Sequence, residues 1–160
     1  MTRNARPSQV EPLQLDTLPG HLIRRLHQIT AGIYTQEVGE KSVTQVQFAA
    51  LQALRNHPGV DQRTLAKLIA LDASTTGGVI DRLEARGLVD RRLSPNDRRV
   101  KLLYITHEGE ALLDRLVPLM LRAQERMLEP LAPEQRAQFM EMLAVLVSVN
   151  NELSRAPGME

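Results

Sequence analysis

Apolar residues recur every three or four positions along much of the chain, which is the period of helices that bury one face. The first stripe of this kind contains Leu22, Leu26, Ile29 and Ile33. Pro19 stands just before the stripe and suits the first turn of a helix, where the missing N–H has no partner to lose. The pattern predicts a helix over about 19–38.

Three shorter helices are predicted next, over about 44–57, 62–71 and 73–87. Thr44 and Asp61 are candidate N-caps of the first two, and Gly87 is a typical C-terminal stop for the third. The second and third follow each other closely. This spacing is typical of a helix-turn-helix.

Two strand-like segments come directly after the third helix. "LVDRRL" covers 88–93 and "RVKLLYIT" covers 99–106, with the turn-forming residues "SPND" between them. A helix-turn-helix that is followed by a hairpin is the winged version of that motif. The remaining pattern predicts two long helices, over about 107–131 and 133–153.

The two C-terminal helices differ in what their patterns imply. Pro118 lies inside the first and is expected to bend it. The second carries a stripe that ends with Leu146, Val149 and Leu153, and too little chain remains to cover it. We therefore expect a second copy of the chain to cover this face.

Charge is distributed unevenly, although the chain as a whole is nearly neutral, with 20 Lys and Arg, 19 Asp and Glu and a net charge of +1. Residues 82–101 contain seven basic and three acidic side chains, whereas residues 107–160 contain five and nine. A local excess of cations favours a surface that binds a polyanion.

Composition excludes several classes of protein. The chain has no cysteine, which rules out disulfides and thiolate metal sites. It has no apolar run of membrane-spanning length and no apolar signal core, so we expect a cytoplasmic protein. Its four aromatic residues are too few for a platform that stacks single-stranded bases.

The cations of the predicted hairpin suit DNA. Arg98 and Arg99 lie at its tip, where they can enter the narrow minor groove. Asp97 can accept from a guanidinium and hold it in one pose. Arg91 and Arg92, on the first strand, can reach phosphates. The alternative is a solvated hairpin with ordinary surface arginines.

The start of the third short helix is the predicted recognition element. Ser74, Thr75 and Thr76 can meet base edges or phosphates, or one of them can cap the helix. Gly77 and Gly78 cost helix stability, by roughly 1 kcal/mol each relative to Ala, and favour close approach to DNA or another helix.

Residues 71–113 resemble the winged-helix core of the MarR family of transcription regulators. The motifs that carry the resemblance are Asp97-Arg98-Arg99, Ile105-Thr106 and Glu108-Gly109. The resemblance implies Arg99 as the minor-groove arginine and Asp97 as its orienter. Many members have Thr-Arg where this chain has Gly77-Gly78, which implies a different operator.

The resemblance also implies a mostly α fold with a small β-wing, in which N- and C-terminal helices of two chains interlock in an obligate homodimer over a pseudopalindrome. The expected parts are a flexible arm at 1–17, a dimerisation helix at 18–43, a winged lobe at 44–106, dimerisation helices at 107–154 and a loose tail at 155–160. The expected DNA-binding residues are Ser74, Thr75, Thr76, Gly78, Arg82, Arg91, Arg92, Asp97, Arg98 and Arg99.

The family often senses small aromatic acids in a cleft beside the dimer helices. The first helix has candidate carboxylate partners beside its apolar stripe, namely His21, Arg24, Arg25 and His27. These groups can equally serve the dimer interface or solvent. The four histidines lack the spacing of metal ligands, so we expect no metal and no cofactor.

The favoured interpretation is a transcription regulator, expected to be a repressor, that a small aromatic acid releases from its operator. An enzyme is disfavoured because the sequence contains no nucleophile motif and no phosphate-binding loop. Two alternatives stay open: a winged-helix module that binds only protein, and a regulator with a non-aromatic effector or none.

Overall fold

The computed structural model describes residues 13–40, 42–154, 156 and 158. Most of them are helical, and a small antiparallel sheet forms the wing, which confirms the predicted fold class. The helices are η1 (Leu15–Thr17), α1 (Pro19–Val38), α2 (Gln45–Asn56), α3 (Gln62–Leu68), α4 (Ala73–Ala85), α5 (His107–Leu128), α6 (Pro133–Val149) and η2 (Asn151–Leu153). The strands are β1 (Val60–Asp61), β2 (Val89–Leu93) and β3 (Lys101–Ile105).

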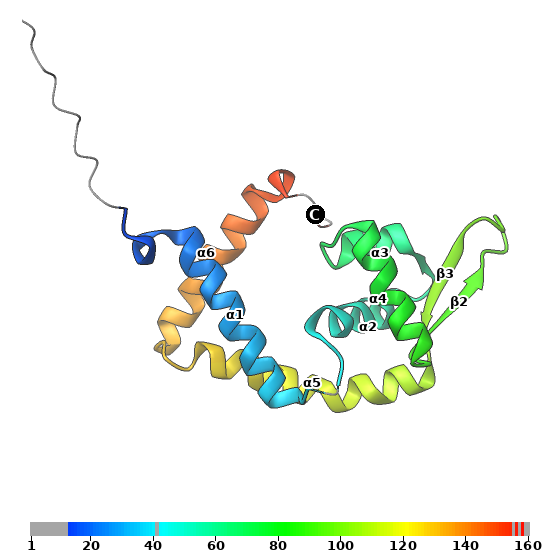
Figure 1. Ribbon diagram of the computed structural model, residues 1–160, viewed down its shortest axis with the longest axis horizontal. Coiled ribbons are helices and arrows are strands. Elements are labelled where there is room, and N and C mark those ends of the chain that lie inside the picture. The colour runs from blue at the N-terminus through cyan, green and yellow to red at the C-terminus, as the bar shows by residue number, and fades with distance from the viewer. Residues whose placement is uncertain (1–12, 41, 155, 157, 159–160) are drawn as a thin grey trace, which may run out of the picture.

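The long helix α5 connects two parts of the molecule (Figure 1). At one end it packs along α1, with α6 beyond it. At the other end it joins a lobe made of α2, α3, α4 and the sheet, from which the β2–β3 hairpin projects into solvent. The elements expected to read DNA and the helices expected to dimerise are therefore separated in space.

The short helices of the lobe begin where side-chain caps satisfy their first N–H groups. The Thr44 hydroxyl accepts from the N–H of Gln47, and the Gln47 side chain accepts from the N–H of Thr44. Asp61 accepts from the N–H of Thr64 over 2.7 Å. Both predicted caps are confirmed, and they define where α2 and α3 start.

The core of the lobe lies between α2, α3, α4 and the sheet, and the first part of α5 closes it. Its largest side chains are fully shielded from solvent. Burial of apolar surface stabilises a fold by roughly 25 cal/mol per Å², so these side chains contribute most to the stability of the lobe. They include Leu51, Leu54, Leu65, Ile80, Leu83, Leu103 and Leu113.

The sheet contains one strand more than the sequence predicts. Its order is β1-β3-β2, and the two-residue strand β1 pairs with Leu102 and Leu103 of β3. Gly59 precedes β1 with φ +80°, and a Cβ there would collide with the ring of Tyr104. A glycine is therefore needed to bring β1 against β3.

Gly109, in the first turn of α5, marks another close approach. A Cβ at this position would overlap the backbone carbonyl of Leu88 and the side chain of Ile105. The N-cap Thr106 accepts from the N–H of Gly109 and donates to the carbonyl of Gly87. The glycine thus lets α5 rest directly on the start of the hairpin.

α5 is one helix that contains Pro118. One detail of the C-terminal half differs from expectation. α6 ends at Val149 instead of continuing to Leu153, because the chain turns at Asn150 and forms η2. At the other end of the chain, η1 lies within the segment expected to be a loose arm, and residues 1–12 of that arm are outside the described residues.

Candidate nucleic-acid interface and effector site

α4 presents one exposed stripe to solvent. Ser74, Gly78 and Arg82 follow one another at intervals of four residues, so they lie on one side of the helix. Ser74 and Arg82 are exposed, and Gly78 is half-buried. Thr75 is also exposed, and its hydroxyl donates to Asp72 over 2.6 Å. This side of α4 can approach a flat or grooved partner closely.

Thr76 does not belong to that stripe, and its assignment as a DNA contact is wrong. Its side chain is fully buried, and its hydroxyl donates to the backbone carbonyl of Asp72 over 2.8 Å.

The N-cap of α4 is Asp72 rather than one of the three hydroxyl residues. The hydrogen bonds from Thr75 to the Asp72 carboxylate lower the pKa of Asp72, which stays charged at the start of α4.

The two glycines of α4 face different surroundings. A Cβ on Gly77 would lie 3.1 Å from the side-chain nitrogen of Gln62 on α3, which donates to the carbonyl of Ala73. A Cβ on Gly78 would meet only the Arg82 guanidinium, at 3.8 Å. Gly77 therefore serves the packing of α3 against α4, whereas Gly78 leaves a notch on the exposed stripe.

The hairpin tip is held by backbone hydrogen bonds, with Ser94 and Val100 closing it over 2.9 Å. The Asp97 carboxylate accepts from the backbone N–H of Arg99, also over 2.9 Å. The expected bond from Asp97 to a guanidinium is not what the structure shows, because the Asp97 carboxylate instead orders the turn by accepting from a backbone N–H. Arg98 and Arg99 remain exposed at the tip.

Arg91 and Arg92 differ, although the sequence suggests similar roles. Alternation along β2 directs Arg91 toward α4, where it pairs with Asp81 and Glu84 at 2.6 and 2.5 Å. Arg92 points to the other side and lies 4.6 Å from the ring centre of Tyr104. Arg91 is therefore occupied within the protein, and its assignment to a phosphate is not supported. Arg92 remains exposed.

Burial acts on the Arg91 guanidinium in the direction of a lower pKa, but hydrogen bonds and charges from Asp81 and Glu84 outweigh it and raise the pKa. Arg91 is therefore a permanent cation between two carboxylates. The pairing joins the last turns of α4 to β2, the first strand of the wing.

The four expected effector residues lie on α1 but do not form one cluster. Arg25 lines an apolar cavity of about 380 Å³, together with Leu22, Leu26, Phe139 and Leu143. Among its described lining residues, Arg25 is the one charged side chain. One cation in an apolar wall is the arrangement that a small aromatic carboxylate needs.

His27 faces a different cavity, of about 390 Å³, beside the loop between α1 and α2. Tyr34 forms part of its wall, and burial raises the pKa of Tyr34 to about 12. The Tyr34 hydroxyl donates to the carbonyl of Val43 over 2.8 Å, which holds this loop in place. Arg24 donates to Gln28 on the surface, and His21 is half-buried one turn before Arg25.

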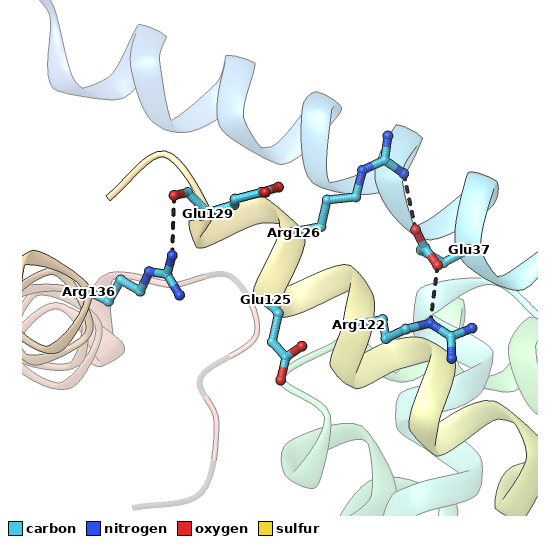
Figure 2. A pocket seen from close by; sticks show the side chains of 6 residues that line it. All are labelled: Glu37, Arg122, Glu125, Arg126, Glu129 and Arg136. Atoms are coloured by element: carbon cyan, nitrogen blue, oxygen red, sulfur yellow. Dashed lines mark hydrogen bonds and ion pairs between the residues drawn. The ribbon is translucent and has the colours of Figure 1, made fainter. Parts of the chain in front are cut away.

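A third cavity, of about 470 Å³, lies where α1, α5 and α6 meet (Figure 2). Figure 2 shows Arg122 and Arg126 of α5 reaching the same carboxylate, that of Glu37 on α1, at 3.5 and 3.1 Å. Arg136 of α6 donates to the backbone carbonyl of Glu129. Because these cations already have partners within the protein, they hold the helices together and are poorly placed to bind an acid.

Two further findings concern the described residues as a whole. No group of three or more potential metal-ligating side chains gathers anywhere in the described ranges. None of the described helices is both long and apolar enough to cross a bilayer.

The fold and this surface define a winged helix-turn-helix protein. A sequence model of the MarR family matches residues 43–101. The transcriptional repressor NicR of Pseudomonas putida is 32% identical over 91% of this chain and 92% of its own length. The chain belongs to the MarR family, whose members are transcription regulators.

Two solved structures agree with this assignment. The regulator PcaV of Streptomyces coelicolor, in complex with its natural ligand, has a TM-score of 0.81 and 37% identity, covering 87% of this chain and 98% of PcaV. BpsR of Bordetella bronchiseptica, whose DNA binding is regulated by 6-hydroxynicotinic acid, has a TM-score of 0.81 and 32% identity, covering 84% of this chain and 96% of BpsR.

Proposed function

We propose that the protein is a transcriptional repressor that binds a pseudopalindromic DNA operator as a homodimer. The observation that carries the proposal is the position of two exposed features on one lobe: the α4 stripe at Ser74, Gly78 and Arg82, and a wing tip with Arg98 and Arg99. A helix of this kind fits the major groove, and a cationic tip fits the adjacent minor groove.

The apolar surface of α1 and α6 supports the dimer. Among the described residues, nine of the fifteen large apolar side chains that are exposed lie on these two helices. Three of the nine, Leu22, Ile23 and Ile29, also line the Arg25 cavity, so this cavity would lie at the edge of the dimer interface. Val145, Val147 and Val149 are each more than 60% exposed. Exposed apolar surface on this scale marks an interface, and a second copy of the same helices is the partner that symmetry favours.

A dimer gives the DNA contacts their spacing. Two lobes related by a twofold axis read half-sites about 34 Å apart, one turn of the duplex. The lobe of each chain is joined to the α1 and α6 end by helix α5 and by the loop between α1 and α2. A small rotation of α5 therefore changes the distance between the two α4 helices, and the operator fits only one distance.

We propose a small aromatic acid as the effector, in the cavity at Arg25. The support is the apolar wall, the single cation and the aromatic ring of Phe139. BpsR, which shares the fold and responds to a heteroaromatic acid, favours the same ligand class. Binding there, between α1 and α6, would favour a lobe spacing that does not match the operator.

The test of DNA binding starts with a duplex that the full-length protein selects from a random pool. Arg99→Ala should weaken binding of that duplex by about 1–3 kcal/mol per lobe, because a minor-groove contact is lost. Its melting temperature should barely change, because an exposed tip substitution usually alters stability by less than about 0.5 kcal/mol. Arg99→Lys should restore only part of the affinity, since lysine lacks the planar guanidinium.

The measurement is fluorescence anisotropy at fixed salt, repeated over a range of salt concentrations. Binding should weaken steeply as salt rises, because neutralised phosphates release counterions. The alternative function, a winged-helix module that binds only protein, predicts that no duplex is selected. An unchanged dissociation constant for Arg99→Ala would show that the wing does not touch the duplex.

A further inference from the structure

Arg91 links the two elements that are proposed to read DNA. We propose that Arg91 is a positioning residue: its two ion pairs fix the angle between α4 and the wing, and this angle determines how well the protein distinguishes its operator from other duplexes. The inference rests on the proposed DNA-binding function.

The geometry of the link is specific. Asp81 and Glu84 are three residues apart on α4, so their carboxylates lie on neighbouring turns of the same side. Nη2 of Arg91 lies 2.6 Å from Asp81, and Nη1 lies 2.5 Å from Glu84. Each guanidinium nitrogen thus has its own carboxylate, and the planar fork resists rotation of β2 against α4.

Arg91 does not itself reach a phosphate in this arrangement. Its side chain is only 17% exposed, whereas that of Arg92 is 63% exposed. To meet DNA, Arg91 would have to leave both carboxylates and uncover them. Arg92 points away from α4 over Tyr104. Its ion pair with Asp90, at 3.5 Å, is exposed, so the guanidinium can still approach the backbone of a duplex.

The angle matters more for specific than for non-specific binding. In a specific complex α4 and the wing tip must enter adjacent grooves at the same time, so an error in their angle costs base contacts. Non-specific binding depends mainly on the number of phosphates that are neutralised. Loosening the link should therefore lower operator affinity and leave the salt dependence of binding unchanged.

The decisive variant is Asp81→Asn with Glu84→Gln, in the full-length chain. It keeps the size of both side chains and keeps Arg91, but it removes two negative charges from the DNA-facing helix. Charge alone predicts tighter binding to every duplex. The loss of the link predicts weaker binding to the selected duplex, by about tenfold, with equal or tighter binding to a scrambled duplex of the same composition.

Arg91→Met and Arg91→Lys complete the series, and Arg92→Met is the matched control. Arg91→Met should reduce affinity for the selected duplex by about tenfold or more with an unchanged salt slope, and Arg91→Lys should restore part of it. Arg92→Met should weaken both duplexes alike and flatten the salt slope. Thermal melting of each variant shows whether the fold is kept. If Arg91→Met does not fold, the variant with Asp81→Asn and Glu84→Gln, here called the amide pair, provides the test.

The outcomes separate the inference from the function beneath it. If the wild-type protein selects no duplex, the proposed function and the inference both fail. If it does, and the amide pair binds both duplexes more tightly, or Arg91→Met flattens the salt slope as Arg92→Met does, only the inference is overturned. Arg91 would then be a phosphate contact or a bystander rather than a positioning residue.

Discussion

Replacing Gly78 by alanine should make the protein more stable and at the same time a weaker DNA binder. Gly78 lies in the interior of α4, where a glycine costs about 1 kcal/mol relative to alanine. The added Cβ would meet nothing closer than the Arg82 guanidinium, at 3.8 Å, which is ordinary van der Waals contact. The substitution therefore fits the free protein without strain.

The gain in stability can be estimated from these surroundings. About 1 kcal/mol per chain corresponds to an increase in melting temperature of about 2–4 °C for a chain of this size.

In the operator complex the same methyl group would occupy the notch between Ser74 and Arg82, where the proposal brings DNA close to the backbone. Overpacking of a closely fitted surface costs about 1–3 kcal/mol, so affinity should fall by roughly 5- to 150-fold.

The assay pairs calorimetry with anisotropy on the selected duplex, and Gly77→Ala is the control. Gly77 faces α3, and its Cβ would press on the Gln62 side chain at 3.1 Å. The control should thus gain less stability and keep most of its affinity. Should Gly78→Ala raise the melting temperature without weakening operator binding, the close approach of DNA at Gly78 would be wrong.

The other two predictions concern acid stability and the effector. Hydrogen bonds from Thr64 lower the pKa of Asp61 in the folded protein. The cap of α3 should therefore stabilise the fold fully at pH values above the pKa of Asp61 in the unfolded chain, about 3.9. This stabilisation should be lost as the pH falls through the lower pKa of the folded state. Asp61→Ala should cost about 1 kcal/mol at pH 7 in urea unfolding and much less at acid pH; an equal loss at both would contradict the cap. Arg25→Ala should abolish the rise in melting temperature that millimolar benzoate or 6-hydroxynicotinate gives the wild type, whereas His27→Ala should keep it. If neither acid shifts the wild-type melting temperature, the proposed effector class is wrong.

The sequence predicts the helices well because both their periodicity and their ends are local. Pro19, Thr44 and Asp61 mark helix starts that the structure confirms to within a residue. The strand β1 is missed because two residues carry no periodic signal, and only contact with β3 makes them a strand. The end of α6 is misjudged because Leu153, beyond the turn at Asn150, continues the apolar stripe of the helix.

Side-chain roles are harder to predict, because they depend on which neighbour a residue meets. Thr76 and Thr75 have similar chemistry, but a turn of 100° places one in the core and the other in solvent. The different roles of Arg91 and Arg92 follow from the alternation along β2, since adjacent residues of a strand point to opposite faces. Asp72 is a strong N-cap residue in its own right and could have been preferred to the hydroxyls of Ser74, Thr75 and Thr76.

Under the proposed function, the arrangement of α5 would let one small ligand affect both DNA contacts of a lobe. Leu113 and Leu116 anchor the first half of α5 in the lobe core, and Arg122 and Arg126 bind its second half to Glu37 of α1. Close-packed side chains hold the first half of α5, and α1 packs along its second half. We therefore expect a shift of α1 against α6 at the Arg25 cavity to move the lobe through α5. If Arg91 fixes the angle between α4 and the wing, as proposed above, α4 and the wing tip would lose their fit to the operator together.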